Sequence, residues 1–107
     1  MASIPERDWK ALRSLKGEML NEACERILRQ VESMLVDREG REHERYLELW
    51  KLLREEDEDI ALMFDNLTRN HAYLKLLAMR SRGVLSDERL SRFSEETRKR
   101  LQRSLED

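Results

Sequence analysis

Residues that interrupt helices are scarce in this chain of 107 residues, which has one proline and three glycines. They are Pro5, Gly17, Gly40 and Gly83. Proline lacks a backbone donor, and glycine loses more conformational entropy in a helix than other residues, so both are rare inside helices. Their scarcity favours long helices and predicts an all-α protein.

Cysteine and long apolar runs are also nearly missing. Cys24 is the single cysteine, which excludes an intrachain disulfide and a cysteine-based metal cage and favours a reducing compartment. The longest apolar runs, such as Ile60–Phe64, are far shorter than the about 20 residues that span a bilayer. The chain start has no apolar stretch of the signal-peptide kind. We therefore expect a cytoplasmic protein that does not contact a membrane.

Charged residues, by contrast, are abundant at 41% of the chain, against about 25% in average globular proteins. The net charge of -2 hides an asymmetry. Residues 1–68 hold 11 basic and 17 acidic side chains, which gives -6, and residues 69–107 hold 10 basic and 6 acidic, which gives +4. The overall balance argues against a dedicated nucleic-acid binder, although a local basic patch remains open.

Apolar residues recur at steps of three and four along the first part of the chain, from Trp9 to Leu35. This spacing predicts one helix over 5–38. Gly40 can adopt the left-handed conformation that ends helices at low cost. A second helix over 41–65 follows, so the first half of the chain is predicted to form a long antiparallel hairpin.

Polar side chains at 65–70 compete with the helix for backbone hydrogen bonds and mark a break. A third helix is predicted over about 69–82, ended by Gly83. Ser86 and Ser94 are each followed by two acidic residues, the pattern of a helix N-cap. Two short C-terminal helices are therefore expected.

Four aromatic residues follow the helical spacing of the hairpin: Trp9, Tyr46, Trp50 and Phe64. Such a stripe is typical of a core, and Trp and Tyr are also enriched where proteins bind one another. A helix of about 34 residues is roughly 50 Å long, and short C-terminal helices can hardly cover its whole apolar flank. We therefore predict these aromatics as candidates for an interface with another chain.

Acidic pairs spaced three apart occur on both hairpin helices, among them Glu22 with Glu25 and Glu55 with Glu58. In this respect the chain resembles the all-α nucleoside-triphosphate pyrophosphatases of the MazG and dUTPase-like type. That resemblance implies inward acidic pairs that hold magnesium at the substrate phosphates. At about 100° per residue, however, these pairs point away from the apolar faces, so they are predicted to be solvated.

Asp57 is the exception among the acids, because it lies four residues after Leu53 and three before Ile60, on the apolar face. A charge there is predicted to be a buried polar residue that makes a specific interhelical contact, with a functional carboxylate as the alternative.

Other catalytic signatures are missing. Neither His43 nor His71 belongs to a Glu-x-x-His or H-E-x-x-H motif, and the glycines form no phosphate-binding loop. We therefore predict no catalytic residue, no metal ligand and no cofactor. The C-terminal third has eight basic side chains that could face a phosphate, but only Tyr73 and Phe93 could stack on bases there.

These patterns predict one helical domain over 1–107, with the hairpin at 5–65, a third helix at about 69–82 and short helices at 86–105. The predicted function is a protein–protein interaction or scaffold role, with a second copy as the partner (a homodimer) or another helical protein. The two alternatives are a magnesium-dependent pyrophosphatase-like enzyme and a nucleic-acid-associated accessory protein.

Overall fold

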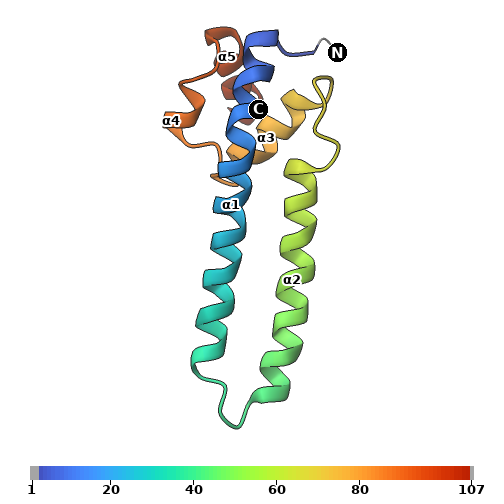
Figure 1. Ribbon diagram of the computed structural model, residues 1–107, viewed down its shortest axis with the longest axis vertical. Helices are drawn as coiled ribbons and strands as arrows, with labels where there is room; N and C mark the ends of the chain where they lie inside the picture. The colour runs from blue at the N-terminus through green and yellow to red at the C-terminus, as the bar shows by residue number, and fades with distance from the viewer. Residues whose placement is uncertain (1–2, 107) are drawn as a thin grey trace.

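The computed structural model describes residues 3–106, which contain helices and connecting loops but no strand. The all-α prediction is therefore confirmed. The helices are α1 (Glu6–Val36), α2 (Glu42–Phe64), α3 (Ala72–Ser81), α4 (Asp87–Leu90) and α5 (Glu95–Glu106). Figure 1 shows α1 and α2 as a long antiparallel hairpin, with α3, α4 and α5 gathered at its open end.

The hairpin has the predicted turn. α1 ends at Val36, and Gly40 has φ +80°, in the left-handed region. Glu42 accepts a hydrogen bond from the Gly40 N–H at 3.1 Å, and Arg38 donates to the Leu35 carbonyl oxygen at 2.9 Å. Side chains at the turn thus bind a carbonyl group of the last turn of α1 and an N–H group of the loop.

The break after α2 is also present, but the third helix begins at Ala72, three residues later than predicted. The backbone reverses at Asn66, which has φ 54°. Thr68 and His71 then form a local turn, in which the two side chains are hydrogen-bonded at 2.8 Å. The His71 N–H donates to the Thr68 carbonyl oxygen at 3.1 Å. This turn takes the place of the first turn of the predicted helix.

The predicted end of the third helix and the predicted caps are confirmed. Gly83 has φ +76°, and the N–H groups of Val84 and Leu85 return to the Met79 carbonyl oxygen at 2.9 and 3.1 Å. Ser86 caps α4 by accepting from the Arg89 N–H at 3.2 Å. Ser94 accepts from the N–H of Thr97 at 3.3 Å, at the start of α5. Each of these ends follows the sequence pattern.

The hydrophobic core lies at one end of the molecule, which we call the head. It joins the first half of α1 to the end of α2 and to α3–α5. Its buried apolar residues are Ile4, Leu12, Leu15, Met19, Ala23, Met63, Phe64, Ala72, Tyr73, Leu76, Met79, Val84, Leu85, Phe93 and Leu101. We call the rest of the hairpin, residues 24–62, the stem.

The stem has no buried side chain of this kind. The molecule measures 54 × 26 × 24 Å, and its radius of gyration is 16.7 Å, against about 13 Å for a compact chain of this length. Its accessible surface is 7370 Å², whereas a compact monomer of 12.9 kDa exposes about 6,300 Å². The single chain therefore exposes about 1,000 Å² more than a compact fold of its mass.

One buried carboxylate fixes α5 to α1. Asp8 is fully buried, and its Oδ1 accepts from the Ser94 N–H at 2.7 Å. Its Oδ2 accepts from the hydroxyls of Ser94 and Thr97 at 2.7 and 2.5 Å. Three donors compensate the loss of solvent around the charge, and the carboxylate lies at the positive end of the α5 dipole.

Arginines close the head onto the hairpin. Arg89 donates to Glu22 at 3.1 Å, to Glu18 at 3.2 Å and to the Val84 carbonyl oxygen at 2.9 Å. Burial lowers the pKa of Arg89, but its hydrogen bonds to Glu22 and Glu18 outweigh that effect and raise the pKa above its ordinary value. Arg82 pairs with Asp59 of α2 at 3.0 Å. Basic residues of the C-terminal third thus meet acidic residues of the hairpin, which accounts for the charge asymmetry of the sequence.

Among the helices within residues 3–106, none combines the length and the apolarity that a membrane crossing requires.

Candidate interaction surface

The stem carries an open apolar groove between α1 and α2, with a volume of about 520 Å³. Its lining residues are Cys24, Ile27, Trp50, Leu53, Arg54, Asp57 and Ile60. All of them belong to the hairpin, and none comes from α3, α4 or α5. We call this feature the stem groove, and it places five apolar or weakly polar side chains beside one basic and one acidic group.

Aromatic side chains border the stem groove. Trp50 is 57% exposed and Tyr46, one helical turn earlier, is 56% exposed. Their rings lie edge to face, with centroids 6.4 Å apart and planes at 83°. Exposed aromatics that support each other in this way present a large apolar area with little conformational freedom. Such residues frequently contribute most of the free energy at protein interfaces.

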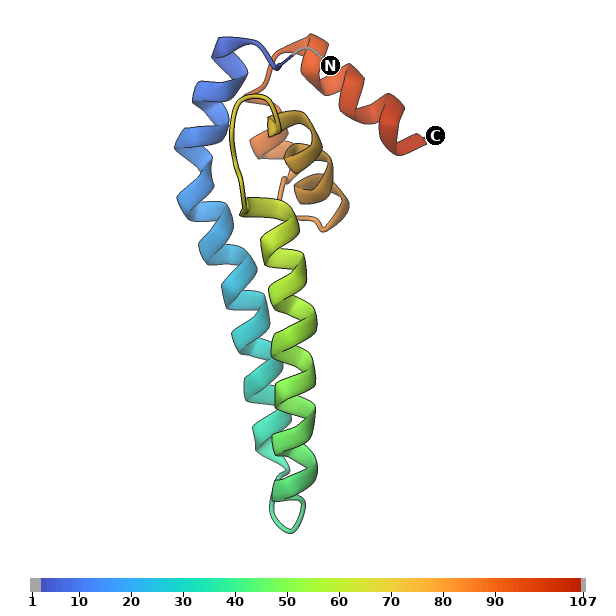
Figure 2. The same ribbon diagram turned by 90° about the vertical axis from the view of Figure 1, so that its right-hand side faces the viewer.

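The opposite side of the hairpin is more polar. A hollow of about 180 Å³ there includes Arg26, Glu56 and Asp59 of the hairpin together with Arg82 and Val84 of the head. Figure 2 shows that α3, α4 and α5 project to one side of the hairpin. The hollow and the stem groove share Ile27 and Ile60, but only the hollow has lining residues from the head.

The four predicted interface aromatics separate into two pairs. Tyr46 and Trp50 lie exposed on the stem, as an interface requires. Phe64 belongs to the head core, where it is only 7% exposed, and Trp9 is half-buried against the same core. The helical spacing does not distinguish them, since the difference depends on where the head covers the hairpin.

The prediction that Asp57 is buried is wrong for the single chain. Its side chain lies in the stem groove beside Trp50, Leu53 and Ile60, as the helical phase required, but the residue is exposed. Within residues 3–106 no helix lies over the groove on this side of the stem, so the aspartate is exposed to water. The prediction was correct about the face on which Asp57 lies and wrong about its burial.

The acidic pairs of the hairpin do not assemble into a metal site within the part of the chain that the structure describes, where no three His, Cys, Asp or Glu side chains come together. Several of these carboxylates have arginine partners instead. Glu22 pairs with Arg26 at 3.0 Å, and Glu25 pairs with Arg29 at 3.1 Å. This arrangement gives the pyrophosphatase-like alternative no support.

The basic residues of the C-terminal third are mostly engaged as well. Arg80 pairs with Asp87 at 2.6 Å, Lys99 pairs with Glu95 at 3.0 Å, and the Arg100 guanidinium stacks 3.7 Å from the centre of the Tyr73 ring. Cations held within the fold in this way form no continuous phosphate-binding stripe. The nucleic-acid alternative therefore gains no support.

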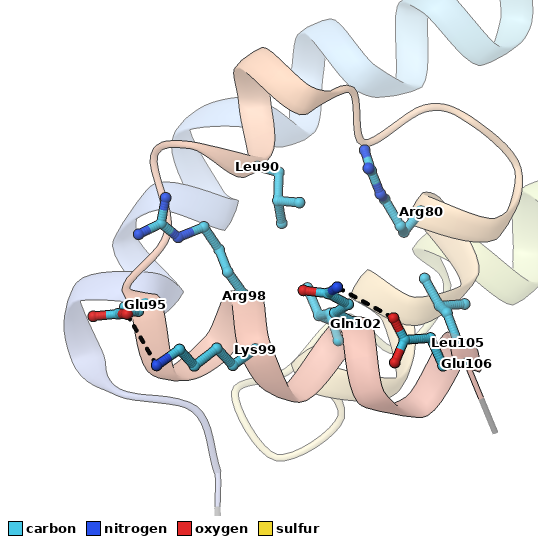
Figure 3. Close-up of a pocket in the computed structure, with 9 residues that line it drawn as sticks. Arg80, Leu90, Glu95, Arg98, Lys99, Gln102, Leu105 and Glu106 are labelled. Atoms are coloured by element: carbon cyan, nitrogen blue, oxygen red, sulfur yellow. Dashed lines mark hydrogen bonds and ion pairs between the residues drawn. The ribbon is translucent and has the colours of Figure 1, made fainter.

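A hollow of about 570 Å³ lies between α4 and α5 (Figure 3). Leu90, Leu101 and Leu105 supply its apolar part. Along α5 the polar side chains bind one another, because Lys99 pairs with Glu95 and Gln102 donates to Glu106 at 3.2 Å. Its charges are mixed and largely paired, so it indicates no particular ligand.

Sequence reasoning did not identify Arg54 as a residue of the surface. The signal was present, since Arg54 lies four residues after Trp50 and three before Asp57, the spacing of one helical face. It likewise overlooked Asp8, whose partners are more than 80 residues away in the chain. A local pattern can identify a residue such as Arg54, which shares a helical face with its neighbours. It cannot identify a residue such as Asp8, whose partners are distant in the sequence.

Comparisons of the chain with protein-family models, with curated proteins and with solved structures gave no match.

Proposed function

We propose that this protein is a helical interaction protein that associates with a second copy of itself through the stem groove. The single observation that carries the proposal is the stem, whose 39 residues include many apolar side chains but none that is fully buried. Apolar surface of this extent is unfavourable in water and normally contacts another chain.

The exposed area also fits a partner of ordinary size. Each subunit of a standard interface loses about 800 Å² of accessible surface on binding. The chain exposes 7370 Å², an excess of about 1,000 Å² over a compact monomer. If a second copy covered the stem groove and its borders, the accessible surface of each chain would come close to that of a compact monomer of the same mass.

Sedimentation equilibrium of the purified protein tests the proposal. A dimer at micromolar concentration is expected, and a species of 12.9 kDa throughout that range would contradict it. If a different helical protein is the natural partner, the purified chain alone will stay monomeric, and homodimerisation will be rejected.

Matched alanine variants identify the surface. Trp50→Ala is expected to weaken the dimer by about 30-fold or more, since truncation of a central interface aromatic costs about 2 kcal/mol or more. Leu53→Ala, which removes a groove side chain, should weaken it as well. Leu62→Ala is the control, because Leu62 is on the same helix and 51% exposed but does not line the groove. Equal effects of Leu53→Ala and Leu62→Ala would place the interface elsewhere.

A further inference from the structure

One face of α2 carries five residues at alternating steps of three and four: Leu47, Trp50, Arg54, Asp57 and Ala61. This is the heptad-like spacing with which two helices pack side by side. Leu47 and Trp50 are both more than half exposed, and Arg54 and Asp57 are exposed too. The face therefore has the spacing of a helix-packing seam, but in the described part of the chain its central residues are exposed.

The centre of this seam is charged. Arg54 and Asp57 both line the stem groove, one turn apart. Within residues 3–106 neither takes part in an ion pair or a side-chain hydrogen bond, whereas Arg26 and Arg29 of α1 and Asp59 of α2 each have an ion-pair partner. Their neighbours Lys51, Glu55, Glu56 and Glu58 on α2 are unpaired as well within these residues. Two opposite charges amid apolar side chains are favourable in an interface when each has a complement, which a partner can supply.

A second copy supplies that complement in one orientation only. In a parallel two-fold pair, equivalent residues of the seam face each other, so Arg54 would meet Arg54 and Asp57 would meet Asp57. In an antiparallel pair whose axis passes between residues 55 and 56, Arg54 of each copy faces Asp57 of the other. The same axis places Trp50 opposite Ala61, a large side chain opposite a small one.

From this pattern we propose that two copies pack antiparallel across the stem groove, with two reciprocal Arg54–Asp57 ion pairs at the centre. The inference rests on the proposed self-association and adds its orientation and register. The axis lies near the middle of α2, which spans Glu42–Phe64, so the two stems overlap along most of their length. Helices α3, α4 and α5 project to one side of the hairpin (Figure 2), and none of their residues lines the stem groove.

Charge reversal tests the register. Asp57→Arg places a second guanidinium opposite Arg54 of the other copy, and Arg54→Asp places two aspartates opposite each other. Each single variant is expected to raise the dimer dissociation constant at least about tenfold, since like charges across an interface are strongly unfavourable. The double variant Arg54→Asp with Asp57→Arg restores both pairs with reversed polarity. Its dissociation constant should return to within about threefold of the natural protein, as for a pair whose coupling is recovered.

Glu55→Arg is the matched control, because Glu55 is exposed on α2 but does not line the groove. It changes the charge of the helix by the same amount and should leave dimerisation within about threefold of the natural protein. Circular dichroism of all variants separates a loss of association from a loss of folding, because a folded chain retains its helical spectrum.

The outcomes distinguish the register from the association on which it rests. If the natural protein is a monomer, the proposed self-association fails. If the natural protein is a dimer but the double variant is no tighter than the single variants, the antiparallel register is wrong and the association stands. If Asp57→Arg has no effect, Asp57 lies outside the interface and the register is equally rejected.

Discussion

Asp8 and Ser94 are 86 positions apart in the chain, yet the aspartate accepts two hydrogen bonds from the serine, from its N–H and from its hydroxyl, both at 2.7 Å. Ser94 in turn caps α5 by accepting from the Thr97 N–H. The start of α1 and the start of α5 are thus held by one carboxylate. Because Asp8 is fully buried, no water can replace it as the acceptor without a change in packing.

Asp8→Ala is expected to destabilise the protein by about 2–4 kcal/mol, because it leaves one buried and two partly buried donors without their charged acceptor. Chemical denaturation followed by circular dichroism measures the loss. Asp8→Asn should cost less, since its side-chain oxygen can still accept. Glu6→Ala is the control, because Glu6 is also an acid in the first turn of α1 but is exposed, and it should change stability by less than about 0.5 kcal/mol. A loss no larger than that of Glu6→Ala would show that the clamp contributes little.

Two glycines should respond to alanine in opposite ways. Gly17 lies inside α1 and Gly40 has φ +80°, and a Cβ at either position would meet nothing within 4 Å. Gly17→Ala should stabilise the fold by about 0.5–1 kcal/mol, because alanine loses less entropy in a helix. Gly40→Ala should destabilise it by about 1–2 kcal/mol, because a side chain is unfavourable in the left-handed conformation. Thermal melts at one protein concentration measure both, and the same sign for both would contradict this assignment.

Cys24 gives a probe of the stem groove that needs no mutation. Its thiol is exposed in the single chain and lines the groove. In a dimer that covers the groove, its reaction rate with a thiol reagent should fall in proportion to the fraction of free monomer as the protein concentration rises. The denatured chain, which should react equally at every concentration, is the control. A rate independent of concentration in a folded dimer would show that the interface leaves the groove open.

The hairpin turn should be sensitive to acid. Hydrogen bonds from the backbone N–H groups of Glu42 and Gly40 lower the pKa of the Glu42 carboxyl below 4.5. The folded form therefore gains stability from this carboxylate at pH values above 4.5, and loses it as the pH falls through the lower pKa of the folded state. Hydrogen exchange at the Gly40 amide should accelerate in Glu42→Gln at neutral pH, relative to the natural protein at the same pH. The control Glu39→Gln changes an exposed acid of the same turn and should have no such effect.

The sequence predicts the helices well because the signals that define them are local. The glycine at the hairpin turn, the glycine after α3 and the serine caps each act within a few residues of their position. The third helix begins later than predicted because Thr68 and His71 form a side-chain hydrogen bond that helix propensity does not register. The turns, the caps and the Thr68–His71 hydrogen bond are all short-range effects. Local sequence signals therefore predict most of the helix boundaries.

Burial depends instead on contacts between distant segments, and there the sequence is less informative. Phe64 and Trp50 share the same helical stripe, but only Phe64 is covered, because α3 and the loop before it fold over that end of α2. Asp57 falls on the predicted face but lies farther from that end of α2, in the stem groove, and it is exposed. Helical phase identifies which side chains share a face, whereas the placement of the head decides which part of that face is covered.

The uneven core has a consequence for how the chain is made. Buried residues are widely separated in the sequence, from Ile4 to Leu101, so the core is incomplete until Leu101 has left the ribosome. The hairpin emerges first, with its apolar side chains still uncovered. During synthesis the nascent chain therefore exposes both the future core and the stem groove. Neighbouring copies on one messenger, or a chaperone, would meet this surface before the head closes.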